Sequence, residues 1–581
     1  MFKTNWFVIL FFTVLFSFQL IHLDADPSPL KRIGDLGDEG YWVHNARSKV
    51  LFNTFIPDDL KMSYYGAPLF NLLTYTSFTL VGVSYFSARL VPIISLWFII
   101  LMLFLMFKSS CGYKNAFICA FLFGFMHELL MYAKWGTPLL LEICFLTFIL
   151  FLSSKQKKTN FSFYLIGAAY SLAILSKLTA VMFLPVLASY LFIEYLRDYI
   201  SIKEISRVLL GFLIVMVPFV ILFIIPNINE YKLLLEYTAS GSVNINRIIK
   251  HIVFSPFGFT IMQYPSTFFV FISVLLYFAF GFLKINNYQR LKYSFNNLTS
   301  IELFCICWIV IYSISLCING QMGYDRRMVH FYIPFFILAG QYLINSELIS
   351  ENINKNKKMI VLIITSVLSS YYLAGVIVNG LHQWINPNDY FSFFPDIPFK
   401  IRGPKEQLYY TSKYLVFTFP LCFLFIYLII YRFTKNSINK LLILSFICPN
   451  IMLNGIWYSR ATYSIRNSSN KINKLSSDSL YIVGGHAHWL SVNTKLRPIF
   501  YHQTGNYTKI NRWFKNQIDS TKFILISNYK YEHKLLHKPT PRIDFQEIGD
   551  RKITELGGIN YYTHLSEQSG YRKNKFIYLI E

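Results

Sequence analysis

The stretch "RLVPIISLWFIILMLFLMF" (residues 89–107) carries one charged side chain, Arg89, followed by 18 uncharged and mostly apolar residues. A helix needs about 20 such residues to cross the hydrocarbon core of a bilayer. Inside that core the backbone finds no water, and a helix satisfies its own N–H and C=O groups. The stretch therefore predicts a membrane-spanning helix with Arg89 as a structural anchor at its head.

Similar apolar runs recur along the chain as far as about residue 457. Of the 581 residues, 54% are hydrophobic and 14% are charged, which excludes a large soluble enzyme. We predict a polytopic α-helical membrane protein with about thirteen spans. These are residues 5–23, 89–107, 115–133, 137–153, 161–177, 179–196, 205–226, 265–284, 300–319, 329–345, 359–379, 413–431 and 441–458.

Lys and Arg gather in alternate loops between these spans, and such loops are typically cytoplasmic. The N-terminus is then cytoplasmic, whereas the first long loop (24–88) and residues 460–581 lie outside. We read the first span as a retained helix because "QLIHLDADPS" (19–28) offers no small-residue cleavage site. The cytoplasmic loops also account for much of the net charge of +24, so nucleic acid is not an expected partner.

The first outer loop contains two stretches with helical character, "DEGYWVHNARSKVLFN" (38–53) and "APLFNLLTYTSFTLVG" (67–82). Pro68 suits a first helical turn and Gly82 suits a helix end. We expect both helices to lie along the outer membrane surface.

Residues 460–581 differ from the rest, because short β-prone runs alternate there with polar stretches. The runs are "SLYIV" (479–483), "RPIFY" (497–501), "KFILIS" (522–527), "INYYT" (559–563) and "KFIYLI" (575–580). We predict a small extracytoplasmic α/β domain at 460–581, following a transmembrane domain at 1–459. With 19 Lys and Arg against 9 Asp and Glu, this domain should be attracted to anionic membrane lipids.

Acidic residues are concentrated in the first outer loop, at Asp24, Asp26, Asp35, Asp38, Glu39, Asp58 and Asp59. Solvated surface is the ordinary role of such residues. Exposed acids gain nothing beside anionic headgroups, however, which favours a functional use. A carboxylate there could deprotonate an acceptor hydroxyl as a general base, or it could hold a divalent cation.

The order of these segments resembles the GT-C type integral-membrane glycosyltransferases, the protein O-mannosyltransferases and lipid A aminoarabinose transferases. The resemblance rests on "DEGYW" (38–42) and "GAPLFNLL" (66–73) between the first two spans. It continues with "LLMYAKWGTPLLLE" (129–142), "GAAYSLAILSKLTAV" (167–181) and "YDRRMVHFYIPFFILAG" (324–340). It implies a sugar donor on polyprenyl phosphate, transfer with inversion, and a glycolipid, polysaccharide or protein acceptor.

The resemblance makes Asp38 the catalytic base, with Glu39 assisting or binding a cation. The departing phosphate needs cations. The candidates are Arg326, Arg327 and Lys177, with Lys61 and Lys134 as weaker options. The arginines could simply anchor at headgroups, Lys177 could snorkel, and the other two lysines could lie at the surface. Tyr41, on the same helix as Asp38, is a further substrate-binding candidate.

The chain departs from the family pattern in two places. Ala67 stands where a Lys precedes the proline of the second surface helix, so phosphate binding must be arranged differently. Leu139 stands where a second acid often follows Pro138, and the nearest acid is Glu142. A carboxylate within a span is costly and often functional, which makes Glu142 the candidate second acid.

We therefore expect a glycosyltransferase of the bacterial inner membrane that acts on the extracytoplasmic side. One alternative is a transporter or flippase for lipid-linked sugars, but the repeats and broken spans of that class are not evident. Another is an oligosaccharide ligase or polymerase, which moves a whole glycan from the same kind of carrier.

Overall fold

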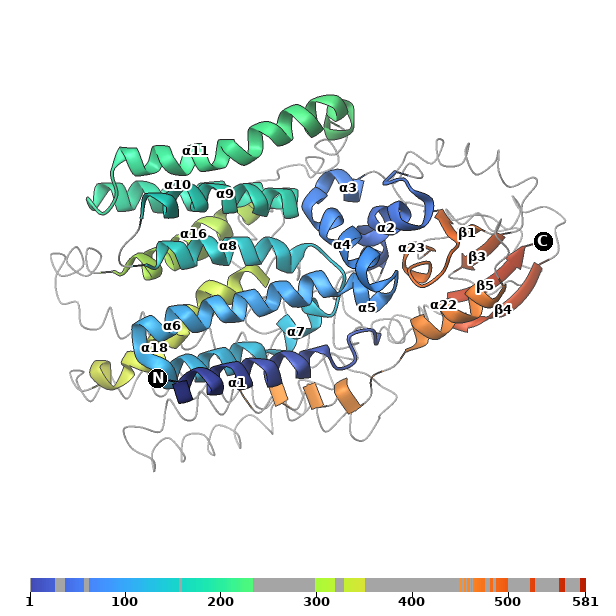
Figure 1. The fold of residues 1–581 in the computed structure, drawn as a ribbon, viewed down its shortest axis with the longest axis horizontal. Coiled ribbons are helices and arrows are strands. Elements are labelled where there is room, and N and C mark those ends of the chain that lie inside the picture. The colour runs from blue at the N-terminus through green and yellow to red at the C-terminus, as the bar shows by residue number, and fades with distance from the viewer. Residues whose placement is uncertain are drawn as a thin grey trace, which may run out of the picture. The chain divides into compact units, whose positions relative to one another are not determined.

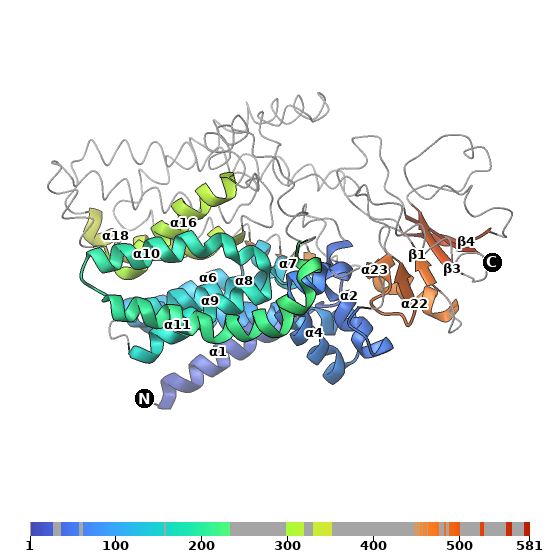
Figure 2. The same ribbon diagram turned by 90° about the horizontal axis from the view of Figure 1, so that it is seen from above.

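A computed structural model gives the arrangement of the chain (Figures 1 and 2). The structure describes residues 2–26, 37–56, 62–155, 159–232, 298–318 and 329–350, parts of 447–499, and 523–527, 553–559 and 575–580. The predicted spans 265–284, 359–379 and 413–431 lie outside the described residues. The chain divides into two compact units, which we describe separately. The first contains Met1–Leu20, Ile93–Ala133 and Leu139–Ser459, and the second contains Ile21–Pro92, Lys134–Pro138 and Arg460–Glu581.

The first unit is helical, and its helices fall on the predicted spans. They are α1 (Phe2–Leu20), α6 (Leu90–Gly124, which begins in the second unit), α7 (His127–Ala133), α8 (Leu139–Ser153), α9 (Asn160–Ser176), α10 (Leu184–Leu196), α11 (Ile202–Phe219), α16 (Ser300–Ile318) and α18 (Tyr332–Ser350). Short 3₁₀ turns η1 (Leu178–Phe183) and η4 (Val329–Phe331) precede α10 and α18. Tyr85–Ser110, Leu178–Leu196 and Ile202–Lys232 are long and apolar enough to cross a membrane.

The predicted span 115–133 is bent rather than straight. Its two parts, Gly112–Gly124 and His127–Ala133, meet at 62°. Two asparagines from the last predicted span bind the break: the His127 N–H donates to Asn450 Oδ1 (2.8 Å), and Asn454 Nδ2 donates to the Phe125 carbonyl (2.9 Å). These bonds satisfy backbone groups that a continuous helix would have paired within itself.

Helices α9 and α11 pack side by side at a pair of glycines (Figure 1). A Cβ on Gly167 would lie 1.9 Å from the Val208 carbonyl oxygen, and one on Gly211 would lie 2.1 Å from that of Tyr164. Small residues at this contact let the two backbones approach closely, as is common between membrane helices.

In the second unit the two predicted surface helices are present as α2 (Gly37–Phe52) and α4 (Pro68–Val81), with α3 (Met62–Gly66) and α5 (Tyr85–Ala88) beside them. Pro68 lies in the first turn of α4. Gly82 ends α4 with φ 91°, and its N–H bonds the Phe78 carbonyl, as expected. Their predicted position along the membrane surface stays a prediction.

The terminal part of the second unit holds α22 (Ser464–Leu475), α23 (Ala487–Leu490) and a five-stranded sheet. The strands are β1 (Tyr481–Val483), β2 (Arg497–Ile499), β3 (Phe523–Ser527), β4 (Ile553–Ile559) and β5 (Lys575–Ile580). Their order is β2-β1-β3-β5-β4, with β2 and β3 parallel to β1, and β5 antiparallel to both β3 and β4. Four strands fall on the predicted runs.

The run predicted at 559–563 shares only Ile559 with β4, and its other residues lie outside the described residues. The β4 sequence "ITELGGI" contains two glycines and a glutamate, which have weak strand preference. Pairing with β5 stabilises this strand, and a local reading of propensity cannot detect that pairing.

Candidate functional site

The carboxylate pair Asp38-Glu39 occupies the first turn of α2, where the positive end of the helix dipole favours negative charge. Successive residues on a helix point about 100° apart. The two side chains accordingly differ in burial: Asp38 is half-buried, whereas Glu39 is fully buried at 0% exposure. Asp38 is therefore the member of the pair that solvent reaches.

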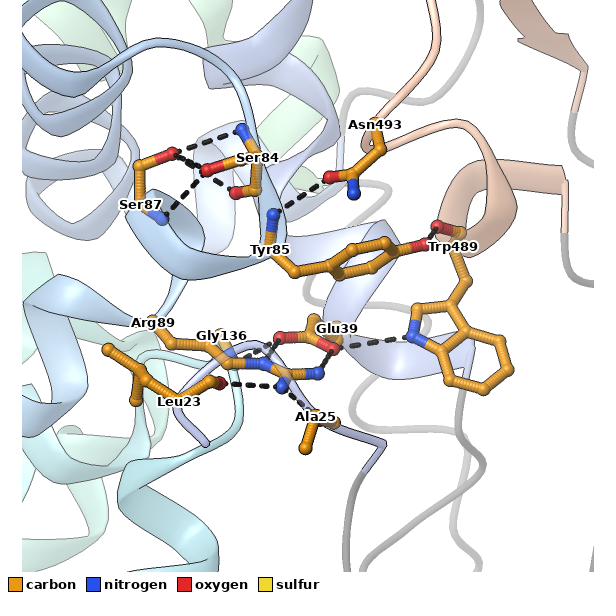
Figure 3. Close-up of polar contacts among 10 residues, drawn as sticks. All are labelled: Leu23, Ala25, Glu39, Ser84, Tyr85, Ser87, Arg89, Gly136, Trp489 and Asn493. Carbon is orange, nitrogen blue, oxygen red and sulfur yellow. Dashed lines mark hydrogen bonds and ion pairs between the residues drawn. The ribbon is translucent and has the colours of Figure 1, made fainter. Parts of the chain in front are cut away.

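Glu39 forms a bidentate ion pair with Arg89 (Figure 3). Arg89 Nε lies 2.6 Å from Glu39 Oε1, and Arg89 Nη2 lies 2.7 Å from Oε2. The Arg89 side chain is 1% exposed, so both charges are removed from water. Paired N–H···O bonds of this kind fix orientation as well as supplying energy.

Further donors complete the surroundings of this ion pair. The Gly136 N–H donates to Glu39 Oε1 (2.9 Å), and the Trp489 indole N–H donates to Oε2 (3.3 Å). Arg89 Nη1 donates to the carbonyls of Leu23 (2.8 Å) and Ala25 (2.5 Å). One buried carboxylate thus joins segments that lie far apart in the sequence.

These contacts revise the expectation for Glu39. We expected it to assist at the acceptor or to bind a cation, but both of its oxygens accept bonds from Arg89. A cation could bind these oxygens only by displacing a buried guanidinium, so Glu39 does not fit the role of a cation ligand. Arg89, predicted as a structural anchor, is buried in this ion pair. Within the part of the chain that the structure describes, no three His, Cys, Asp or Glu side chains come together as a metal site.

Lys134 lies in the second unit, in the short segment that also contains Gly136. Its amine is 1% exposed and donates to the Ile21 carbonyl. Burial is the main cause that lowers the pKa of Lys134 to about 7; the nearby Arg89 charge acts in the same direction, and Asp24 opposes the shift. Near neutral pH this lysine is therefore only partly charged.

The first unit contains a second buried carboxylate, Glu142, at the start of α8. Lys177 Nζ lies 3.8 Å from its Oε2, and His330 Nε2 lies 3.3 Å from its Oε1. The Thr179 hydroxyl lies 3.3 and 3.4 Å from the two oxygens. The structure thus brings together two predicted candidates, Glu142 and Lys177, that are 35 positions apart.

Sequence reasoning missed His330 and Thr179. Each stands close to a residue that was noticed, Thr179 two places after Lys177 and His330 three places after Arg327. Nothing local marked either one as a neighbour of Glu142, because turns η1 and η4 make that contact.

Other candidates are placed less fully. Tyr41 is half-buried on α2, with its ring at 5.4 Å from the Trp42 ring in an edge-on arrangement. Arg326, Arg327 and Lys61 lie outside the described residues, as do the acidic residues Asp35, Asp58 and Asp59.

Comparison with solved structures covers almost the whole chain. ArnT from Cupriavidus metallidurans bound to undecaprenyl phosphate matches with a TM-score of 0.56 and 13% identity over 99% of this chain and 98% of ArnT. The apo form of ArnT matches with a TM-score of 0.57 and 13% identity over 100% and 98%. The chain has the GT-C fold.

The comparison of sequences agrees with this GT-C fold. Residues 66–222 match the model of the dolichyl-phosphate-mannose-protein mannosyltransferase family. The resemblance to the protein O-mannosyltransferase and ArnT superfamily is thereby confirmed. The oligosaccharyltransferase AglB from Archaeoglobus fulgidus is a weaker match, with a TM-score of 0.45 and 10% identity over 90% of this chain and 70% of AglB. No curated protein sequence gives a significant match.

Proposed function

We propose that this protein is a glycosyltransferase that takes a sugar from a polyprenyl-phosphate carrier and passes it to a hydroxyl group on the extracytoplasmic side of the bacterial inner membrane. The acceptor is a glycolipid, a polysaccharide or a protein. The family match and the likeness to ArnT, whose crystal structure holds undecaprenyl phosphate, support this class. The observation that carries the proposal is the half-buried Asp38 beside an immobilised Glu39.

In the proposed reaction, the Asp38 carboxylate takes the proton of the acceptor hydroxyl as that oxygen attacks the anomeric carbon. The bond between this carbon and the carrier phosphate oxygen breaks, and the phosphate leaves with the electron pair. Attack from the opposite side inverts the anomeric centre. Because a lipid phosphate is already a good leaving group, the protein mainly has to supply a base for the acceptor hydroxyl and positive charges around the phosphate.

The remaining candidates receive roles consistent with this chemistry. Lys177, Arg326, Arg327 and Lys61 would balance the phosphate charge, and Tyr41 would contact the substrate. Glu142, predicted as a second acid, pairs with Lys177 and His330. We therefore propose that Glu142 orients the Lys177 amine and does not itself transfer a proton.

The test is Asp38→Asn in membrane vesicles supplied with a polyprenyl-phosphate-linked sugar and the cell-envelope acceptor fraction. Loss of a general base should lower transfer by about 100-fold or more. The matched control is Asp198→Asn, which makes the same change at an exposed residue with φ 58°, a conformation that Asn also accepts. Full transfer by Asp38→Asn at normal protein levels would reject the assignment.

The mass of the product separates the proposed activity from its alternatives. Addition of one sugar supports a monosaccharide transferase, whereas addition of a whole glycan indicates a ligase or polymerase. A flippase would move the lipid-linked sugar across the bilayer without forming a new glycosidic bond. Transfer measured with and without a chelator decides whether a divalent cation takes part.

A further inference from the structure

Helix α23 and the turn that follows it (residues 487–496) contact α2 backbone to backbone within the second unit. The contact lies at Gly40, one residue after Glu39. A Cβ on Gly40 would lie 2.2 Å from the Trp489 nitrogen and 2.4 Å from the His488 carbonyl carbon. These are backbone atoms, which cannot rotate away as a side chain would. The first turn of α2 therefore needs glycine to accept α23.

Polar contacts hold the C-terminal end of the same segment, residues 493–496. Arg47, on α2 and fully buried, donates through Nη2 to the carbonyls of Thr494 (2.6 Å) and Leu496 (2.8 Å). The Tyr85 N–H donates to Asn493 Oδ1 (2.9 Å). Charge-assisted bonds from a buried guanidinium are among the stronger hydrogen bonds in proteins. The turn is therefore fixed along the length of α2.

Trp489 connects this fixed turn to Glu39 (Figure 3). Its indole N–H donates to Glu39 Oε2 (3.3 Å), and its backbone carbonyl accepts a bond from the Tyr85 hydroxyl. The Trp489 side chain is 2% exposed, so its indole has little freedom to turn. Tyr85 thus holds the backbone of Trp489 while the indole holds Glu39.

We infer that Trp489 is a positioning residue for transfer: its indole N–H fixes the Glu39 carboxylate, and through the first turn of α2 it fixes the direction of the Asp38 carboxylate. The inference rests on the proposed function. Trp489 acts through Glu39 and Asp38 and is not itself assigned a contact with substrate. A displacement of about 1 Å in a reacting group can lower a rate about 100-fold, so a modest loss of orientation is measurable.

The experiment is Trp489→Phe in full-length protein, with transfer rates normalised to the amount of folded protein by size-exclusion chromatography. Phe keeps an aromatic ring but has no N–H to donate. We expect kcat to fall about tenfold while KM for the lipid-linked sugar stays within about twofold, because the donor contacts are untouched. A merely structural role would lower the folded fraction and leave kcat per folded molecule unchanged.

Trp308→Phe is the matched control. Trp308 is 0% exposed on α16, and its indole nitrogen has no hydrogen-bond partner among the residues that the structure describes. The same change in size there should leave kcat per folded molecule unchanged. Tyr85→Phe is a second test variant, because it removes the hydroxyl that holds the Trp489 carbonyl and should lower kcat in the same direction.

The outcomes separate the inference from the proposed function. If Asp38→Asn is inactive but Trp489→Phe keeps kcat within twofold of the wild type, the inference is overturned and the proposed function stands. If Asp38→Asn is fully active, the proposed base itself is wrong. Should Trp489→Phe not fold, an unchanged kcat in Tyr85→Phe overturns the inference.

Discussion

Replacing Glu39 by Gln keeps the shape of the side chain but removes the counter-charge of Arg89. The amide oxygen can still accept from the Gly136 N–H or the Trp489 indole. The guanidinium, 1% exposed, would face a neutral amide in place of its two short bonds at 2.6 and 2.7 Å. Arg89 would then be a buried charge whose ion-pair partner has been removed.

Two independent considerations give the expected loss of unfolding free energy. Two unit charges about 4 Å apart attract by about 4 kcal/mol at the effective dielectric constant of about 20 that suits protein sites. Removal of one partner from a buried ion pair typically costs about 3–5 kcal/mol. We therefore expect Glu39→Gln to lower the unfolding free energy of the second unit by about 4 kcal/mol.

Urea-dependent proteolysis of the purified protein in detergent is the appropriate assay. We expect the second unit to lie outside the membrane, where urea acts more readily than on membrane-embedded helices. With a slope of about 2 kcal/mol per molar urea, the cleavage midpoint should fall by about 2 M. The double variant Glu39→Gln/Arg89→Met should recover at least about 2 kcal/mol, because the unpaired charge is gone. A midpoint for Glu39→Gln within about 0.25 M of the wild type would refute the reasoning.

Three further predictions concern single positions. Gly40→Ala should destabilise the second unit by about 3 kcal/mol or more in the same urea assay, because its Cβ would meet the Trp489 backbone at 2.2 Å. Gly455→Ala, whose Cβ would have no atom of the described residues within 4 Å, should match the wild type. The pKa of Lys134 is about 7 in the folded protein and 10.5 ordinarily, so between these pH values the unfolded chain binds more protons than the folded one. The free energy of unfolding should therefore rise with pH, by about 2 kcal/mol from pH 7 to 9. Lys134→Met should abolish this rise. Gly167→Val should prevent α9 and α11 from packing, seen as lost monodisperse protein in detergent, and retention of a wild-type elution profile would contradict that contact.

Local patterns in the sequence predicted much of the fold. Apolar runs located the helices of the first unit among the described residues, and Pro68 with Gly82 marked the ends of α4. Each of these signals depends on residues within about one helix length. The bend before His127 was not predicted, because asparagines more than 300 positions away, Asn450 and Asn454, bind the chain there.

The candidate site was only partly predictable for the same reason. The pair Asp38-Glu39 stood out as acidic residues at a helix start, and the structure places both in that first turn. The difference between them depends on Arg89, 50 positions away, and on Trp489, 450 positions away. Hydrogen bonds between residues so far apart in the chain cannot be predicted from the periodicity of a single sequence.

The sheet of the second unit has a consequence for the order in which the protein matures. Strand β5 follows β4 along the chain, yet it lies between β3 and β4, and β4 pairs with β5. During synthesis, the backbone groups of β4 therefore stay unpaired in this sheet until β5 has been made. A chain truncated between residues 559 and 575 would contain β4 without β5, and the backbone groups of β4 would be open to the wrong partner.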